Sequence, residues 1–149
     1  EINGKSFFIG HGDGLGPNDK GYKRMKKVFV HPFSQWLFGW FHPDLGTRLA
    51  NFSSQKSREA TPPAERNWLG DDKEWLLQYC NRKISQGVEP DYFVFGHRHL
   101  PVDWLLGNGR SRYLNLGDWL HHSSYAVFDG RDMEICFFEN ENGRPVTNR

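Results

Sequence analysis

The pattern of apolar and polar positions along the chain predicts a body that mixes strands and helices. Short apolar runs bounded by glycine or polar residues are typical of buried strands. Such runs occur at residues 6–9, 92–95, 112–116, 125–128 and 133–138. Asp129-Gly130 supplies a turn signal between the last two runs, so we expect a hairpin there.

Between the first two strands, apolar residues recur at helical spacing. One helix is predicted from Asp19 to just before Pro32, and a second, short helix over residues 33–41, where apolar residues occur nearly all round. Residues 51–67 are rich in Ser, Lys, Arg and Glu and contain two prolines, which indicates a polar loop.

The clearest helix is predicted over residues 71–86, where apolar residues form one stripe. Asp71 and Glu74 have the spacing of a capping box, and Gly87 is suited to end the helix. Helices followed by a run of strands are typical of a sheet layered against other secondary structure. We therefore expect an α/β fold.

The domain organisation follows from these elements. We expect a helical insertion and polar loop at 19–67, and a helix with C-terminal strands at 71–139. Asn3-Gly4 is a strong hairpin signal, yet only two residues precede it. The natural chain is therefore expected to extend upstream, with residues 1–149 forming part of one domain.

Composition excludes several functional classes. A formal net charge of +1 and a pI near 8.1 are too mild to indicate a nucleic-acid-binding protein. No run approaches the roughly 20 apolar residues that a transmembrane helix needs. Cys80 and Cys136 lie far apart and form no CxxC pair, so we expect reduced, buried thiols in a cytoplasmic protein. The aromatic content of 15% is high and requires core, interface or ligand contacts.

Three histidines occupy glycine-rich loops directly after predicted strands. His11 follows the first strand, and His97 and His99 follow the second with one residue between them. Side chains at such strand ends can converge on a ligand. Paired imidazoles suit two-metal hydrolases, whose ions lie roughly 3.5–4 Å apart. The sequence thus indicates a metal site, where Asp13 is expected to orient His11 through a hydrogen bond.

The other histidines have plainer interpretations. His31 and His42 both precede proline and are interpreted as loop residues. The pair at 121–122 follows a predicted strand end, where active sites are often found, but solvated surface is the preferred interpretation. Asn115 and Asp118 are expected to close turns.

The sequence resembles a known enzyme superfamily at two places. The Gly-His-Gly-Asp run at 10–13 and the Gly-His-Arg-His run at 96–99 resemble the last two signature blocks of the calcineurin-like metallophosphoesterases. The resemblance implies the C-terminal half of an αββα sandwich and two divalent ions, with Mn2+ preferred. It also implies that His11 and His97 share one ion and that His99 binds the other.

Within that superfamily, the chain most closely resembles the UDP-2,3-diacylglucosamine diphosphatases of lipid A biosynthesis. The closer resemblance lies in the Asp-Lys-Gly-Tyr stretch at 19–22, the apolar insertion at 33–41 and the Ser/Lys/Arg-rich segment at 53–58. It implies that the insertion shelters the acyl chains of a lipid-linked UDP-sugar. The residues expected to bind this substrate are Asp19, Tyr22, Phe33, Trp36, Leu37, Trp40, Lys56 and Arg58.

One departure from the family pattern is large. The usual first metal-binding blocks, including the bridging carboxylate, do not occur in these residues and are expected upstream of Glu1. Three histidines alone are not expected to hold two ions, so residues 1–149 are expected to be inactive by themselves. The complete domain is expected to release UMP and 2,3-diacylglucosamine 1-phosphate, in the cytoplasm and peripheral to the inner membrane.

Two alternatives remain open at this stage, and so does the oligomeric state. The first is another calcineurin-like phosphoesterase that acts on a soluble phosphodiester and does not need the aromatic helix. The second is a non-catalytic lipid-binding remnant, which would bind no divalent ion with useful affinity.

Overall fold

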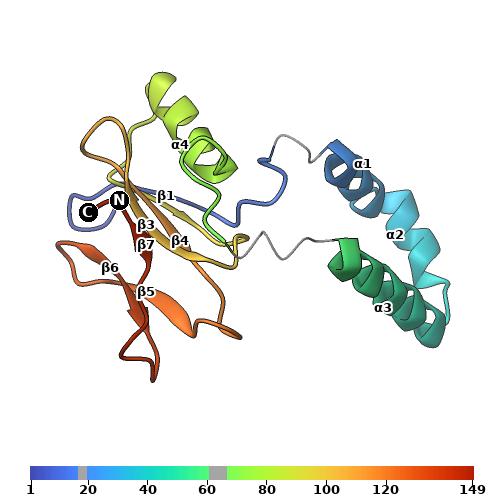
Figure 1. Ribbon diagram of the computed structural model, residues 1–149. Helices are drawn as coiled ribbons and strands as arrows, with labels where there is room; N and C mark the ends of the chain where they lie inside the picture. The colour runs from blue at the N-terminus through green and yellow to red at the C-terminus, as the bar shows by residue number, and fades with distance from the viewer. Residues whose placement is uncertain (17–19, 61–66) are drawn as a thin grey trace. The chain divides into compact units, whose positions relative to one another are not determined.

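The chain divides into two compact units, which comprise Glu1–Leu15 with Ala64–Arg149 and Gly16–Pro63 (Figure 1). We call the first the α/β body and the second the helical unit. The computed structural model describes residues 1–16, 20–60 and 67–149, and within them the side chains of Lys20, Tyr22 and residues 56–60 are outside the description.

A mostly parallel sheet of five strands forms the centre of the α/β body. Its strand order is β1-β2-β4-β3-β7, in which β1, β2 and β4 are mutually parallel and β3 runs antiparallel to β4. These strands are β1 (Phe7–Gly10), β2 (Tyr92–Phe95), β3 (Pro101–Leu105), β4 (Arg112–Leu116) and β7 (Val146–Thr147). The predictions of β1, β2 and β4 are confirmed, whereas β3 and β7 were not predicted.

The body has three layers, because both faces of the sheet are covered. Helix α4 (Trp75–Ser85) packs on one face, where its Leu76 and Cys80 meet Phe93 of β2. The hairpin of β5 (Ser124–Phe128) and β6 (Met133–Phe137) packs on the other. Strand β2 is buried on both sides, which explains why it reads as an unbroken apolar run. The predicted α/β class is confirmed.

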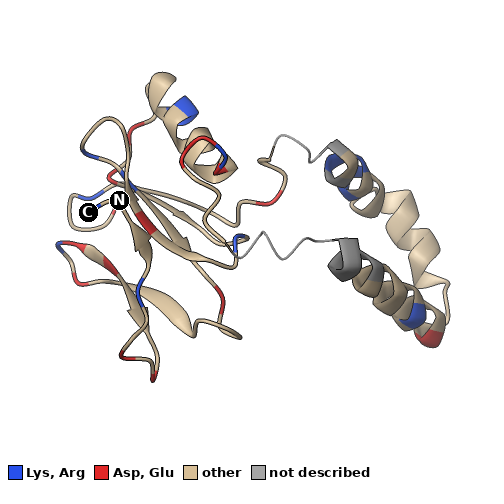
Figure 2. Ribbon diagram, in the orientation of Figure 1, with Lys and Arg blue, Asp and Glu red and all other residues tan. Residues whose placement is uncertain are grey.

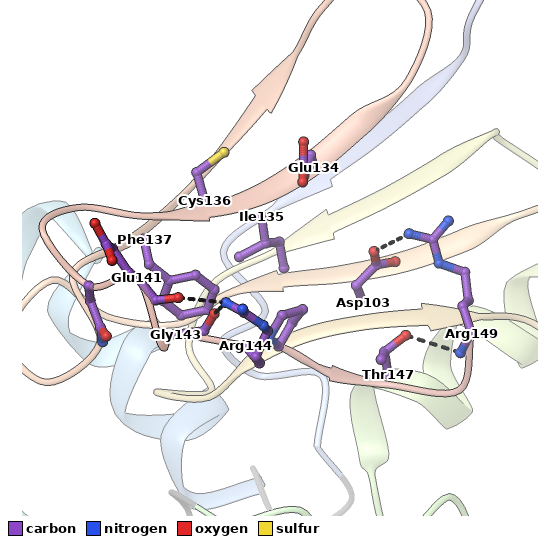
Figure 3. A pocket seen from close by; sticks show the side chains of 12 residues that line it. Asp103, Glu134, Ile135, Cys136, Phe137, Glu141, Gly143, Arg144, Thr147 and Arg149 are labelled. Atoms are coloured by element: carbon purple, nitrogen blue, oxygen red, sulfur yellow. Dashed lines mark hydrogen bonds and ion pairs between the residues drawn. The ribbon is translucent and has the colours of Figure 1, made fainter.

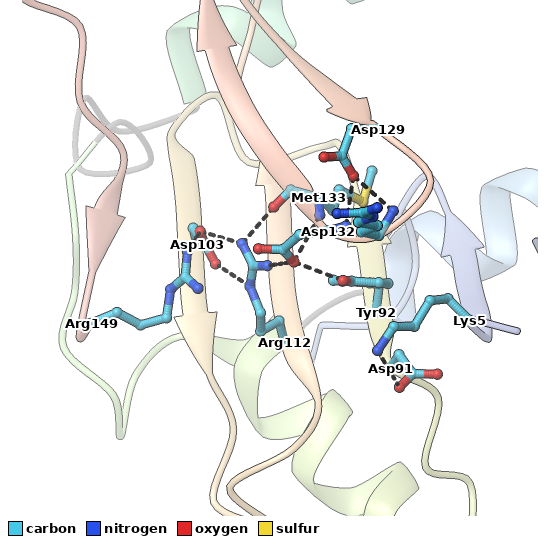
Figure 4. A network of polar contacts seen from close by, with 10 residues as sticks. Lys5, Asp91, Tyr92, Asp103, Arg112, Asp129, Asp132, Met133 and Arg149 are labelled. Carbon is cyan, nitrogen blue, oxygen red and sulfur yellow. Dashed lines mark hydrogen bonds and ion pairs between the residues drawn. The ribbon is translucent and has the colours of Figure 1, made fainter. Parts of the chain in front are cut away.

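A polar network joins the sheet to this hairpin (Figure 4). The Arg112 guanidinium lies 2.6 Å from Asp103 and 2.5 Å from Asp132, and it donates to the Met133 carbonyl. The Tyr92 hydroxyl donates to Asp132 at 2.8 Å. Burial raises the pKa of Tyr92 to about 12, and the neighbouring Asp132 carboxylate adds to the effect. The network therefore fixes the hairpin layer on the sheet.

The two predicted turns are present. Asn3 and Gly4 both have positive φ, and Ile2 and Lys5 exchange backbone hydrogen bonds across them. Gly130 has a φ of +98° in the connection between β5 and β6. Cys80 is buried as predicted, and burial raises the pKa of its thiol, whereas Cys136 is only half-buried.

The helical unit contains α1 (Lys20–Phe29), α2 (Pro32–Gly39) and α3 (Pro43–Ala60). His31 and His42 lie between these helices and cap them, because their Nδ1 atoms accept from the N–H groups of Phe33 and Asp44. No described side chain of this unit is buried. Within the described ranges, no helix of the chain is both long and apolar enough to span a membrane.

Two local predictions are wrong. Residues 51–60 belong to α3 and not to a polar loop; between Asn51 and Ala60 the sequence has no Gly or Pro, and its polar residues suit a solvated helix. The predicted helix start at Asp71 is also wrong, since α4 begins at Trp75 and the N-cap Glu74 makes no capping hydrogen bond. The Glu74 carboxylate bonds instead to Arg98 and to the Leu69 N–H.

Candidate metal centre

Three neighbouring parallel strands of the body end at the same edge of the sheet. The loop after β1 carries His11, the loop after β2 carries His97 and His99, and the loop after β4 carries Asp118. Ligands of open α/β sheets bind at the carboxyl ends of the strands. The topology thus collects the predicted histidines at the edge where chemistry is expected.

His11 and His97 are in direct contact. Their ring centroids lie 5.4 Å apart and the ring planes are nearly perpendicular. A Cβ atom at Gly12 would stand 3.3 Å from the His97 Cβ, and one at Gly96 would stand 3.3 Å from the His11 Nδ1. The Gly96 N–H also donates to the His11 carbonyl at 3.1 Å. Glycine at these two positions therefore lets the two loops approach closely enough for the two imidazoles to meet.

His99 contacts the carboxylate of Asp118, whose side chain is buried. Its Nδ1 is 3.1 Å from the Asp118 Oδ2. An ionised carboxylate only accepts hydrogen bonds, so the contact favours the neutral tautomer with its proton on Nδ1, which has its lone pair on the Nε2. The pair has the form of the carboxylate–histidine arrangements that orient metal ligands.

Asp118 also organises the histidine pair that follows it. Its carboxylate accepts from the backbone N–H groups of His121 and His122 and lies 2.8 Å from the His121 Nδ1. Burial alone would raise the pKa of Asp118, but the bonds from His121, His122 and His99 outweigh it and hold the pKa well below its usual range. Asp118 closes a turn, as predicted, but its contact with His99 was missed. A Gly-Asp pair at a strand end was the available signal.

The predicted role of Asp13 stays a prediction. Asp13 is half-buried in the same loop as His11, two residues further along the chain.

The apolar residues predicted to bind substrate lie in the helical unit. A cavity of about 420 Å³ is lined by residues of α1 and α2, including Phe33 and Leu37. Trp36 contacts both Phe33 and Trp40, with ring centroids 5.8 and 5.7 Å apart, and both tryptophans are exposed. Helix α2 carries no charged residue, in contrast to the Lys- and Arg-rich α1 (Figure 2). The helical unit therefore has an exposed apolar surface on α2 and basic side chains on the neighbouring α1.

The other predicted substrate contacts lie outside the described residues. Asp19 is not described, and neither are the side chains of Tyr22, Lys56 and Arg58. Their predicted roles stay predictions.

A second cavity, of about 490 Å³, lies between β6 and the C-terminal segment (Figure 3). Its Arg144 donates to the carbonyls of Glu141 and Gly143, and its Arg149 is paired with Asp103. The guanidinium groups are thus already bonded within the protein. We do not assign this cavity to the candidate site.

We call the sheet edge that carries His11, His97 and His99 the histidine edge. It has the donor types of a metal centre. Among residues 1–16, 20–60 and 67–149, no group of three or more His, Cys, Asp or Glu side chains is arranged to hold a metal ion. Two imidazoles in contact, with a third imidazole beside a carboxylate, nevertheless are donor types that suit a divalent transition metal. The described donors fit part of a metal site.

Comparison with known proteins identifies similar sequences. No protein-family model matches the chain. A protein named UDP-2,3-diacylglucosamine hydrolase from Porphyromonas gingivalis is 36% identical over 151 residues, covering 94% of this chain and 57% of its own length. Proteins of the same name from Pseudomonas syringae pv. syringae and Photobacterium profundum are 33% and 28% identical, covering 93% and 95% of this chain.

These similarities confirm the resemblance seen in the sequence, which extends over nearly the whole chain. The chain spans 55% to 58% of the length of these three relatives.

Proposed function

We propose that the complete gene product containing residues 1–149 hydrolyses the pyrophosphate of UDP-2,3-diacylglucosamine to UMP and 2,3-diacylglucosamine 1-phosphate. The observation that carries the proposal is the contact of His11 and His97, with ring centroids 5.4 Å apart, in a chain 36% identical to a relative of that name. The proposal places the protein in the cytoplasm, peripheral to the inner membrane.

Metal ligation is the role proposed for the histidine edge. His11 and His97 would hold one divalent ion, and His99 a second. When bound, such ions supply a hydroxide nucleophile near neutral pH and neutralise the charge that develops on phosphate oxygens. The preferred metal is Mn2+, which accepts imidazole beside oxygen ligands. Asp118 would accept from the Nδ1 of His99 and so direct its Nε2 toward the ion.

The helical unit is proposed to bind the lipid part of the substrate. Phe33 and Leu37 line a cavity of about 420 Å³, and the aromatic residues of α2 remain exposed around it. Acyl chains would cover this apolar surface, and the basic residues of α1 suit the phosphate groups of the substrate or of anionic lipids.

The experiment is Mn2+-dependent release of UMP from UDP-2,3-diacylglucosamine by the complete gene product. We expect release that a chelator abolishes and that His97→Ala also abolishes. Activity on a simple phosphodiester without UMP release would contradict the substrate assignment and favour a soluble phosphodiesterase. Inactivity on both substrates, without Mn2+ binding, would favour a lipid-binding module.

A further inference from the structure

The loop that carries His97 contains a strained turn. The Arg98 N–H donates to the Gly96 carbonyl at 2.8 Å, which closes a three-residue turn around His97. The φ of His97 is +67°, a value that is unfavourable for a residue with a side chain. A three-residue turn with a positive central φ is the rarer and more strained form of the γ-turn. Surrounding structure must hold such a conformation.

Arg98 reaches inward from this turn. His97 and His99 are exposed, whereas Arg98 between them is only 3% exposed. Its Nη2 lies 2.7 Å from the carboxylate of Glu74, which is 1% exposed, and it also donates to the Asn67 carbonyl. The pair joins two parts of the body, the loop after β2 and the residue before α4.

The Glu74 carboxylate extends this connection to a third segment. It accepts from the Leu69 N–H at 3.2 Å, while Arg98 donates to the Asn67 carbonyl at 2.8 Å. Residues 67–69 are thus bonded to both members of the pair. One buried ion pair thus connects three segments: the loop that carries His97, the residue before α4, and residues 67–69.

Stability alone explains this pair poorly. The Nε of Arg98 is buried, and no described residue accepts a hydrogen bond from it. Buried ion pairs are often no more stabilising than apolar residues of the same volume. A positional role gives a reason for the pair at the residue that separates two candidate metal ligands.

We propose that Glu74 and Arg98 are positioning residues, which hold the strained turn at His97 and thereby aim His97 and His99 at the metal site. The inference rests on the proposed function. Without the pair, the turn relaxes, and the His97 ring leaves its contact with His11. The pair acts on metal affinity through the histidines and touches neither metal nor substrate.

The test is the Mn2+ affinity of the complete gene product, measured from the electron paramagnetic resonance signal of free Mn2+. A single substitution leaves its partner as an uncompensated buried charge, which is strongly destabilising, so the informative variant is Glu74→Gln with Arg98→Met. We expect this double variant to fold and to bind Mn2+ about 10-fold to 100-fold more weakly, as for other residues that orient metal ligands. Arg98→Lys should recover part of the affinity.

The matched control is a second ion pair that is buried in the described part of the body. Asp103 and Arg112 lie 2.6 Å apart, with side chains 6% and 7% exposed, and neither contacts a candidate ligand in the described residues. Asp103→Asn with Arg112→Met removes a buried pair that also bonds Asp132, Met133 and Arg149, so it is a strict control for a general loss of packing in the body. We expect its Mn2+ affinity to stay within about 2-fold of the wild type, since no ligand-orienting contact is lost.

Amide hydrogen exchange supplies a readout that needs no metal. Exchange at the Gly96 and Arg98 N–H groups should be about 10-fold faster or more in the Glu74/Arg98 double variant, and unchanged in the control. Wild-type affinity together with wild-type exchange in the folded double variant would overturn the inference. If the wild type itself binds no Mn2+, the proposed function fails, and the exchange data alone decide whether the pair holds the turn.

Discussion

The α/β body and the helical unit differ in how far their large apolar side chains are buried. In the body, Leu76, Phe93 and Tyr113 are 0% exposed and form the core between helix and sheet. In the helical unit, Phe33 is 61% exposed and Trp40 77% exposed. Burial of a large apolar side chain contributes about 1.5–3 kcal/mol, so the body gains stability that the helical unit leaves unrealised. The exposed residues of the helical unit remain available to bind a ligand.

In the proposed function, the same division separates chemistry from recognition. Three parallel strand ends of the body present His11, His97 and the Asp118–His99 pair. The two histidines between the helices of the other unit cap those helices. Rigid strands suit ligands that must be held in place, whereas an exposed helical surface suits flexible acyl chains.

The largest expected effect distinguishes histidines of the two units. His97→Ala should lower kcat by more than about 100-fold, because even residues that only orient metal ligands contribute up to about 100-fold. His31→Ala, which removes only a helix cap, should leave kcat within about 2-fold. Steady-state UMP release by the complete gene product measures both. Comparable losses in the two variants would contradict the assignment of the chemistry to the body.

The next effect is a change in the free energy of unfolding, which should be large in the body and small in the helical unit. Phe93→Ala in the core of the body should lower the free energy of unfolding by about 3–5 kcal/mol through lost burial and a cavity. Phe38→Ala, at a residue that is half-exposed on α2, should change it by roughly 0.5 kcal/mol or less. Urea denaturation followed by far-UV circular dichroism gives both values. A large loss from Phe38→Ala would show that the helical unit has a core of its own.

The smallest effect is a pH response of the body, which comes from Tyr92. The pKa of Tyr92 is raised from 10.0 to about 12 by burial and by Asp132. Below pH 10 both states keep the proton; as pH rises from 10 to 12, the unfolded state loses it first, so stability falls across this range.

Tyr92→Phe tests this assignment. The variant should lose about 1 kcal/mol at neutral pH, through the missing hydrogen bond, and should show a shallower fall of stability above pH 10. Urea titrations at several pH values measure the slope. An unchanged slope would mean that other groups cause the alkaline response.

The sequence predicted those elements whose apolar and polar residues follow the ordinary local pattern, without a charged residue that depends on a distant partner. Strands β1, β2 and β4 are apolar runs, and the glycines beside His11 and His97 indicated close loops. Strand β3 was missed because Pro101 and Asp103 interrupt its apolar pattern. Asp103 is tolerated there because Arg112 of the neighbouring strand and Arg149 both pair with it, and local pattern does not reveal such pairings.

Long-range charge pairs account for the other misses. Glu74 has the spacing of a capping residue, but the distant Arg98 binds its carboxylate and α4 starts later than predicted. Asp118 was interpreted as a turn residue, and its contact with His99 depends on two strands ending at one edge. In α3, polar composition was mistaken for a loop, because a solvated helix and a loop share that composition.

The proposed division of roles between the two units is tested most directly by substrate selectivity. The measurement is kcat/KM of the complete gene product for UDP-2,3-diacylglucosamine and for UDP-glucosamine without acyl chains. It compares the wild type with Leu37→Ser, which alters the cavity of the helical unit, and with Leu49→Ser, a similarly exposed leucine of α3 that does not line that cavity.

We predict that Leu37→Ser lowers kcat/KM for the acylated substrate by about 10-fold, the equivalent of one lost apolar contact, and leaves the value for the unacylated substrate unchanged. Leu49→Ser should change neither. Equal losses on both substrates, or no loss on the acylated one, would contradict the account.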